Sequence, residues 1–333
     1  MPQFPEIKPD TPAGLTQLLE SWTTPTFLPQ LVGEWPLVKA ARQSDQALVD
    51  YLLGFDKGIS VDCLRLPHAE QGRVFYNSTF DGFNFERQRL PFQTALQQLL
   101  TLRQTPEPES LYVGSTSVER CLPGMLQQNP MPLDALNPLA TLWIGNKSRI
   151  AAHYDMPDNL ICVTAGKRKV TLFPPDQVEN LYVGPLHFTP AGQAISLVDL
   201  ANPDFEQFPR FRLALEAAMV FELTPGDALY IPSMWWHHIE GQESINMLVN
   251  YWWQSQTPVT GRAENALYHT LLALGGLPDE QRQAWKALFD HYVFGQDPER
   301  FAHIPPSQRG PLEAPDEATL RQFKAMLANS LRQ

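Results

Sequence analysis

The chain has 333 residues, of which 43% are hydrophobic and 11% aromatic, so a substantial core is expected and global disorder is excluded. A formal net charge of −11 argues against a nucleic-acid partner held by phosphate contacts. The three cysteines, Cys63, Cys121 and Cys162, form no closely spaced pair, so we expect no disulfide framework and a reducing, cytoplasmic location.

The first third of the chain is predicted to be a mixed α/β segment, residues 1–110, that packs on the domain after it. No basic region followed by an apolar run opens the chain, and no apolar run approaches the roughly 20 residues that span a bilayer, so neither a secretory signal nor a membrane span is expected. Apolar residues at helical spacing predict helices over 15–22, 35–55 and 91–102, with a second helix starting at Ser44 and Asp45. A strand is expected over 59–64 and a hairpin over 74–85.

The middle of the chain, residues 111–258, has the pattern of a β-rich domain. Short apolar runs bounded by proline, glycine and asparagine predict strands over 111–114, 140–144, 160–163, 170–173, 217–223, 228–231 and 247–253. Residues 176–210 form a long polar insertion, which we interpret as a substrate lid or another functional loop. From residue 259 to residue 333 the pattern becomes helical, with helices expected over 263–274, 279–293 and 316–331.

Two histidine motifs carry the chemistry. His153 and Asp155 are two residues apart in a segment interpreted as a strand, so both are expected on one face. The second motif, GDALYIPSMWWHHI, offers His237 and His238. Two imidazoles and one carboxylate favour non-haem Fe(II) with open positions, and the same set also accepts Mn, Co, Ni or Zn. Either motif alone is more often structural, but both in this order in a β-rich chain predict a metal site.

Two blocks of the sequence resemble the JmjC-type cupins. The first begins at HYD and ends at LFPPDQ, and the second begins at GDALYIP, continues through WWHHIE and ends at VNYWW. The nearest likeness is to the branch with factor-inhibiting-HIF-type asparaginyl hydroxylases and the tRNA wybutosine hydroxylase. The resemblance is dense over residues 140–255. It implies a mainly β fold with flanking helices, namely a double-stranded β-helix (jelly-roll) core with a helical C-terminal appendage. It also implies an Fe(II)/2-oxoglutarate-dependent dioxygenase that consumes O₂ and releases succinate and CO₂.

The resemblance also assigns residues. The iron ligands that it implies are His153, Asp155 and His237, and it leaves His238 in a structural role. The residues that it places around 2-oxoglutarate and the iron pocket are Tyr112, Asn159, Arg168, Asn250 and Trp252.

Two positions depart from the family pattern. Arg168 stands where these enzymes usually have lysine, and arginine can hold a carboxylate with two hydrogen bonds and a permanent charge. Its neighbours Lys167 and Lys169 are expected on the opposite face of the strand. Ile150 stands where close relatives have a co-substrate-binding threonine, which removes one hydrogen-bond donor.

The favoured substrate is a protein or peptide side chain. The alternatives are a small molecule, a modified nucleotide, or a non-catalytic cupin that binds metal. Lysine demethylation of histones is not favoured, because no zinc-binding cysteine cluster accompanies the β domain. The C-terminal helices predict a homodimer, as in the asparaginyl hydroxylases, through apolar residues at helical spacing: Leu267, Leu271, Trp285, Leu288, Phe289 and Tyr292.

Overall fold

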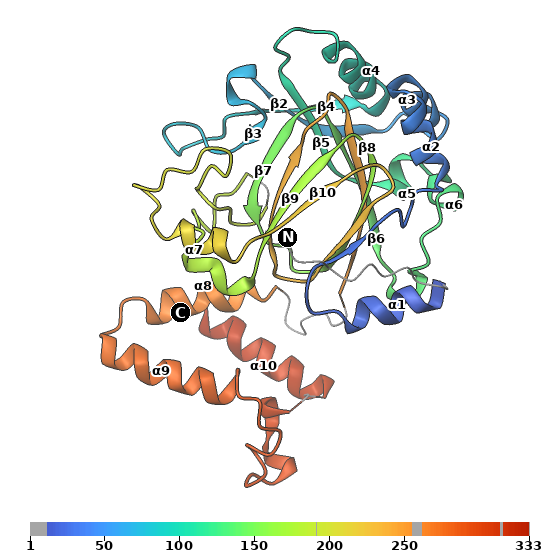
Figure 1. Ribbon diagram of the computed structural model, residues 1–333. Helices are drawn as coiled ribbons and strands as arrows, with labels where there is room; N and C mark the ends of the chain where they lie inside the picture. Colours follow the sequence, from blue (N-terminus) through green and yellow to red (C-terminus); the bar gives the residue numbers. More distant parts are fainter. Residues whose placement is uncertain (1–11, 191, 255–261, 314–315, 333) are drawn as a thin grey trace. The chain divides into compact units, whose positions relative to one another are not determined.

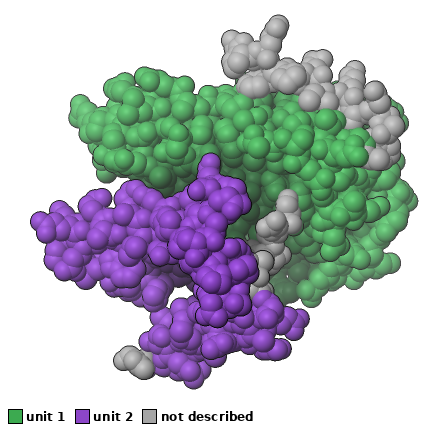
Figure 2. All heavy atoms as spheres, turned by 90° about the horizontal axis from the view of Figure 1, so that it is seen from below, with its two compact units in different colours: residues 1–255 green, residues 256–333 purple. Residues whose placement is uncertain are grey.

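The computed structural model describes residues 12–190, 192–254, 262–313 and 316–332. The chain divides into two compact units, residues 1–255 and residues 256–333, which Figure 2 colours green and purple. The first unit holds the β-sheets, and the second is helical.

Two sheets form the core of the first unit (Figure 1). The larger has the strand order β1-β11-β8-β13-β6-β5-β2-β4, and the smaller has the order β10-β9-β12-β7-β3. The bounds in the larger sheet are β1 Thr26–Leu28, β2 Ser60–Leu66, β4 Glu86–Pro91, β5 Ser110–Ser117, β6 Leu139–Gly145, β8 Asp158–Ala165, β11 Ala228–Ile231 and β13 Asn246–Trp253. Those in the smaller are β3 Arg73–Val74, β7 Ser148–His153, β9 Arg168–Phe173, β10 Met219–Leu223 and β12 Trp236–Gly241.

Apart from the short parallel contact between β3 and β7, the paired strands are antiparallel. Apolar side chains such as Ile161, Val170 and Leu248 fill part of the space between the sheets. Non-consecutive strands pair in both sheets, which is how a jelly roll closes. The predicted jelly-roll fold with flanking and C-terminal helices is confirmed.

Helices cover the outer face of the larger sheet. They are α1 Pro12–Ser21, α2 Pro36–Gln43, α3 Asp45–Leu53, α4 Phe92–Leu102, α5 Val118–Cys121 and α6 Met125–Gln128. Leu37, Leu48 and Leu96 from these helices share one apolar cluster with Leu142 and Val249 of the sheet. The side chain of Ser44 accepts a hydrogen bond from the amide of Ala47, so the predicted helix start at this position is correct.

Three expectations about local structure differ from what the chain adopts. The predicted hairpin over 74–85 reverses direction as expected, but its ladder is reduced to a single bridge between Tyr76 and Phe83. The segment from 150 to 175 contains parts of three strands, β7, β8 and β9, rather than two. Strands β4, β7 and β12 are rich in charged residues and histidine, which have little preference for strands, so their sequences gave little strand signal.

The insertion at residues 176–210 is packed, not loose. Leu181 and Val198 are buried against Ala152 and Trp236, which belong to β7 and β12. The carboxylate of Asp199 lies 2.9 Å from the guanidinium of Arg149 on β7. The insertion begins with a short 3₁₀ turn, Pro175–Glu179, and is followed by α7, Phe211–Glu216. It therefore forms a covering layer over one end of the smaller sheet.

The second unit consists of helices α8 Glu264–Leu274, α9 Asp279–Tyr292 and α10 Glu317–Ser330. None of these three helices has a buried residue among the positions that the structure describes, and Phe301 is the buried apolar side chain of this part. No described helix combines the length and the apolar character that crossing a bilayer requires.

Candidate metal centre

The three candidate ligands converge at one end of the barrel. His153 is the last residue of β7, and His237 on β12 is its direct register partner. Their ring centroids lie 4.3 Å apart. Asp155 Oδ2 lies 3.5 Å from His237 Nε2, and one ligand atom from each of the three residues lies within 4.8 Å of the others. This spacing suits a single ion bound between the three side chains.

The route by which Asp155 reaches the centre differs from the expectation. Because β7 ends at His153, Asp155 lies in the turn before β8 and not on the same strand face. A second turn holds it there: the amide of Met234 donates to the carbonyl of Asp155 at 2.9 Å, and the Ser233 hydroxyl donates to the carbonyl of Met156 at 2.6 Å. The turns that carry Asp155 and precede His237 are thereby fastened to each other.

Both histidines have a fixed orientation. Nδ1 of His153 lies 2.9 Å from the carbonyl of Ala151, and Nδ1 of His237 lies 3.0 Å from the carbonyl of Trp235. A carbonyl can only accept, so each Nδ1 carries the proton and each Nε2 presents its lone pair. Metal-binding histidines characteristically donate their other ring N–H in this way.

The protonation states also suit a cation. Burial, together with the neighbouring His237, lowers the pKa of His153 to about 4, so this ring is neutral at pH 7. Burial alone would raise the pKa of Asp155, but the neighbouring His237 and His153 lower it by more, so the carboxyl pKa lies below its ordinary value. His153 and Asp155 therefore offer a neutral imidazole and an ionised carboxylate, which are the forms that bind metal.

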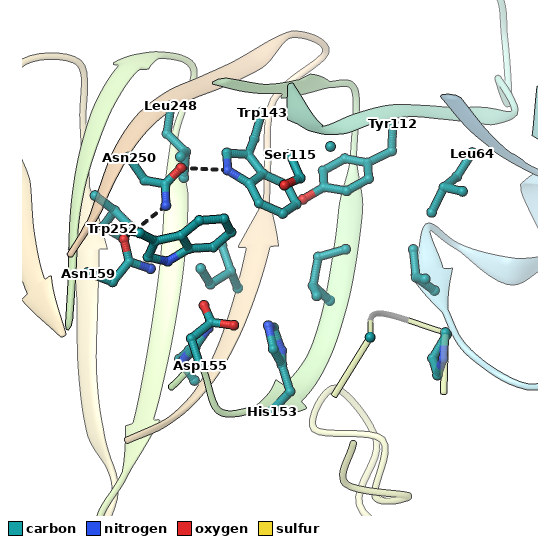
Figure 3. Close-up of a pocket in the computed structure, with 18 of the residues that line it drawn as sticks. Leu64, Tyr112, Ser115, Trp143, His153, Asp155, Asn159, Leu248, Asn250 and Trp252 are labelled. Atoms are coloured by element: carbon teal, nitrogen blue, oxygen red, sulfur yellow. Dashed lines mark hydrogen bonds and ion pairs between the residues drawn. The ribbon is translucent and has the colours of Figure 1, made fainter. Parts of the chain in front are cut away.

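A cavity of about 540 Å³ opens from this centre (Figure 3). All eight sequence-predicted site residues line it, including Tyr112 on β5, Asn159 on β8 and Arg168 on β9. The structure therefore brings the two predicted groups, the metal triad and the co-substrate residues, to the walls of one open cavity. Ile150, Ile161, Ile239 and Leu248 supply apolar wall.

Arg168 is the unusual residue of this cavity. Its side chain is 1% exposed, its Nε has no hydrogen-bond partner, and its Nη2 donates to the carbonyl of Trp143 at 3.4 Å. No carboxylate among the described residues lies within ion-pair distance of it. Burial lowers the pKa of the guanidinium, yet an arginine keeps its charge at neutral pH. An unpaired buried cation costs several kcal/mol, so this geometry favours an anionic ligand.

The residues around Arg168 fit a carboxylate. Burial raises the pKa of Tyr112 to about 12, with Arg168 opposing the rise, so its hydroxyl stays protonated and can donate. Lys167 and Lys169 lie on the opposite side and pair with Glu222 at 3.0 Å and Glu240 at 3.7 Å. The expected separation of Arg168 from its two basic neighbours is thus observed.

Asn250 has a supporting place in the cavity wall. Its oxygen accepts from Trp143 Nε1 at 2.8 Å and from the Thr141 hydroxyl, and its nitrogen donates to Asn159 Oδ1 at 3.1 Å. These bonds use both acceptor positions of the Asn250 side-chain oxygen and one of the two N–H donors of its nitrogen. They orient Asn159, whose own amide nitrogen is free of that contact and is turned toward the cavity in Figure 3.

Trp252 and His238 contact other groups. The Trp252 indole N–H lies near Asp155, close enough to lower the pKa of that carboxyl, although its geometry falls short of a full hydrogen bond. His238 is buried on the other face of β12, with Nε2 3.4 Å from Glu240 Oε1. His237 is therefore the histidine of this pair that faces the centre.

The sequence reasoning missed the outer wall of the cavity. Asp62 and Leu64 of β2, Arg87 of β4, and Thr189 and Pro190 of the insertion line it. These residues come from three separate parts of the chain and carry no motif. Only the pairing of β2 with β4 and the packing of the insertion bring them together.

Comparison with known proteins fits this geometry. A model of the family described as a cupin-like domain matches residues 17–258. The lysine-specific demethylase JMJ31 of Arabidopsis thaliana is 36% identical over 131 residues, which cover 38% of this chain and 23% of that protein. HSPB1-associated protein 1 of Homo sapiens is 30% identical over 135 residues, covering 40% of this chain and 27% of that protein. The tRNA wybutosine-synthesizing protein 5 of Gallus gallus is 30% identical over 145 residues, covering 39% and 42%. The matches span less than half of each relative.

Proposed function

We propose that the chain, which belongs to the cupin-like domain family, is an Fe(II)/2-oxoglutarate-dependent dioxygenase that hydroxylates a protein or peptide side chain. One observation carries the proposal: a two-histidine, one-carboxylate cluster and a buried arginine without a counter-ion face the same cavity. The cluster suits a divalent metal, and the arginine suits the far carboxylate of a dicarboxylic co-substrate.

Each residue then has a defined task. His153, Asp155 and His237 would hold Fe(II), and all three line the cavity in which co-substrate would bind. Arg168 would hold the distal carboxylate of 2-oxoglutarate with two hydrogen bonds, and Tyr112 would donate a third. Asn159, oriented by Asn250, would contact the co-substrate as well. Bound iron would supply oxidative decarboxylation of the co-substrate by O₂, coupled to hydroxylation of a C–H bond.

The remaining cavity residues control access and position. Trp252 places its indole N–H near Asp155, where it favours the ionised carboxylate. Ile150 and Ile239 provide apolar wall, which excludes water and strengthens the charge interactions inside. Ile150 provides no hydrogen bond to the co-substrate, which leaves Arg168 and Tyr112 with a larger share of its binding.

The relatives support the oxygenase class and leave more than one substrate class. One relative is named as a lysine-specific demethylase, and another is named as a tRNA wybutosine-synthesizing protein. The latter supports the alternative of a modified-nucleotide or small-molecule substrate. We favour a peptide because the wall contributed by β2, β4 and the insertion lies open beside an exposed strand. A non-catalytic cupin is the third candidate, and it would bind metal without turning over 2-oxoglutarate.

The proposal is tested by succinate formation. Protein loaded with Fe(II) without oxygen is mixed with 2-oxoglutarate and exposed to O₂, and succinate is measured in the wild type, in Asp155→Ala and in Asp176→Ala. Asp176 is an exposed acid beyond β9 and serves as the matched control. We expect succinate from the wild type and the control, and none above background from Asp155→Ala. A wild type that binds metal and forms no succinate with or without peptides would favour the non-catalytic cupin.

We also propose that residues 111–258 form the catalytic domain, that residues 1–110 pack on it, and that residues 259–333 dimerise. The support for dimerisation is that α8 and α9 leave Leu267, Leu271, Trp285 and Leu288 each more than 40% exposed. Light scattering should give the mass of a dimer for the wild type and of a monomer for Leu271→Glu/Leu288→Glu. Leu213→Glu, an equally exposed leucine on α7, should stay dimeric. A monomeric wild type at micromolar concentration contradicts dimerisation.

Three free, buried cysteines are in keeping with the expected cytoplasmic location.

A further inference from the structure

Strand β4 ends the larger sheet. Its neighbour is β2, and the described residues supply no strand on its other side. The amide of Phe92 donates to the carbonyl of Ile59 at 3.0 Å, so Phe92 and Ile59 form a hydrogen-bonded pair, and every second residue of β4 counted back from Phe92 also faces β2. In an antiparallel pair the hydrogen-bonded positions alternate, so the backbone groups of Arg87 and Arg89 point away from β2. Pro91 follows at the next outward position, which lacks an N–H and marks an edge strand.

The free edge runs beside the cavity. The side chain of Arg87 lines the cavity, and Arg89 is two residues farther along the same face. Neither arginine has a carboxylate within ion-pair distance among the described residues, although Asp62 is the register partner of Arg89. Arg65, on the other face of the same sheet edge, is paired with Glu109. Two exposed arginines that form no ion pair with a described residue therefore lie along this edge, with Asp62 across from Arg89 as the acidic side chain on the same face.

Aromatic rings extend this surface. Phe83 and Phe85 stack with centroids 5.1 Å apart, and the Arg87 guanidinium lies 5.9 Å and 5.7 Å from them. Phe188 of the insertion stacks on Phe83 at 4.7 Å. Arg87 also donates to the carbonyl of Pro190 at 3.3 Å. The mouth thus combines an open strand, positive charge and apolar rings, all held against the insertion.

We propose that β4 is the docking strand for the substrate, an extended acidic peptide segment that adds to the sheet beside Arg87 and Arg89. This inference rests on the proposed function. An added strand forms backbone hydrogen bonds with the outward-facing groups of both arginines, and every second side chain lies on their face. The target residue reaches the cavity, and an acidic residue two positions away pairs with an arginine. The positive charge of the two exposed arginines, neither of which forms an ion pair within the described part of the chain, complements an acidic peptide.

Peptide pools test the proposal. The probes are acetylated and amidated nonapeptides with every natural residue at the centre, glutamate two positions to either side, and threonine or valine elsewhere. Matched pools carry glutamine or lysine in place of glutamate. Fluorescence anisotropy with the Mn(II)-loaded full chain measures binding, and mass spectrometry with the Fe(II) enzyme measures oxygen incorporation. We expect the glutamate pool to bind at least about tenfold more tightly than the glutamine pool, with the lysine pool weakest.

Variants separate the side-chain and backbone contributions. The double variant Arg87→Glu/Arg89→Glu should reverse the order of the pools. Arg89→Pro removes an outward N–H, whereas Arg89→Gln removes the same charge and keeps the N–H, so the proline variant should bind the glutamate pool several-fold more weakly. Thermal melts confirm that each variant is folded. Equal binding of the three pools, or equal binding by the proline and glutamine variants, overturns the proposal. Variants that only lower solubility would show that the arginines merely guard a sheet edge.

The inference and the proposed function fail separately. Wild-type enzyme that forms no succinate in any condition contradicts the proposed function. Enzyme that forms succinate, but neither binds nor modifies the glutamate pool in preference to the others, contradicts the peptide-docking inference alone.

Discussion

His153 and His237 are direct register partners on β7 and β12, and Nδ1 of each is held by the carbonyl two residues before it. The two imidazoles are therefore oriented before any ion arrives. Since Asp155 is fastened by the Met234 amide, the whole triad is organised in the absence of metal.

A preorganised triad predicts stoichiometric metal binding that depends on each ligand. Calorimetric titration with Mn(II) should give one site per chain in the wild type. His153→Ala should weaken binding by at least about a hundredfold, more than the 10- to 100-fold typical of losing a supporting contact. His68→Ala removes an exposed histidine and should bind normally. Unchanged affinity in His153→Ala would mean that the metal binds elsewhere.

Arg168 is predicted to lower the stability of the ligand-free protein and to strengthen the binding of 2-oxoglutarate. Arg168→Met replaces an unpaired buried cation by an apolar side chain of similar size, so we expect a higher melting temperature in the absence of ligands. The same variant should lose affinity for 2-oxoglutarate by about tenfold or more, because a charge-assisted contact contributes about 1.5–3 kcal/mol. Binding of pyruvate, a 2-oxo acid without the distal carboxylate, should change little.

Lys169→Met is the matched control for that experiment, because Lys169 lies on the opposite face and is paired with Glu240. It should leave both the melting temperature and co-substrate affinity near their wild-type values. A lower melting temperature in Arg168→Met would show that the guanidinium is well compensated in the fold and would weaken the argument for an anion.

Asp199 is predicted to hold the insertion in place. Its carboxylate lies 2.9 Å from Arg149 and 3.9 Å from Arg73, so Asp199→Asn leaves two half-buried arginines without their counter-ion. We expect a loss of about 1–3 kcal/mol in urea unfolding and faster proteolysis between residues 180 and 200. Asp176→Asn, an exposed acid of the same region, should have little effect on either measurement. Equal behaviour of the two variants would show that apolar packing alone fixes the insertion.

The cysteines predict a pH dependence. Burial raises the pKa of both Cys63 and Cys121 to about 11 and also raises that of Cys162. At pH 8 the native protein should therefore show no thiols reactive toward a disulfide reagent, and the unfolded chain should show three.

The linkage has a definite sign. Unfolded thiols ionise near pH 8.5 whereas the folded ones stay protonated, so stability should fall as the pH rises from about 8.5 toward about 11. Cys63→Ala/Cys121→Ala should flatten this slope. A rapid reaction of native thiols at pH 8 would show that the core opens locally.

Much of the centre was predictable because its chemistry lies in two continuous motifs. His153, Asp155 and His237 each sit beside strong local signals, such as the apolar run of β8 and the GDALYIP turn and strand. The short apolar segments predicted a β-rich domain, and the resemblance of the two motifs to the JmjC-type cupins implied the jelly roll. The position of Arg168 relative to Lys167 and Lys169 followed from the alternation of a strand, which depends only on backbone geometry.

The rest depends on contacts between distant segments. β12 was missed as a strand and β7 was not separated from β8, because site residues replace the usual β-formers, so local preference and function conflict there. The position of Asp155 in a turn depends on a hydrogen bond from the amide of Met234, which lies 79 residues later in the sequence (234 − 155). Arg87 reaches the cavity only through β2–β4 pairing, for which the sequence contains no motif.

The most direct test of the central claim is calorimetric titration of 2-oxoglutarate into the full chain, with and without Mn(II), in the absence of oxygen. The claim is that one cavity joins a metal centre to a carboxylate-binding arginine. We predict one molecule bound per chain with Mn(II) present and binding at least about tenfold weaker without it. The absence of binding in the metal-loaded protein, or binding of equal strength without metal, would contradict the account.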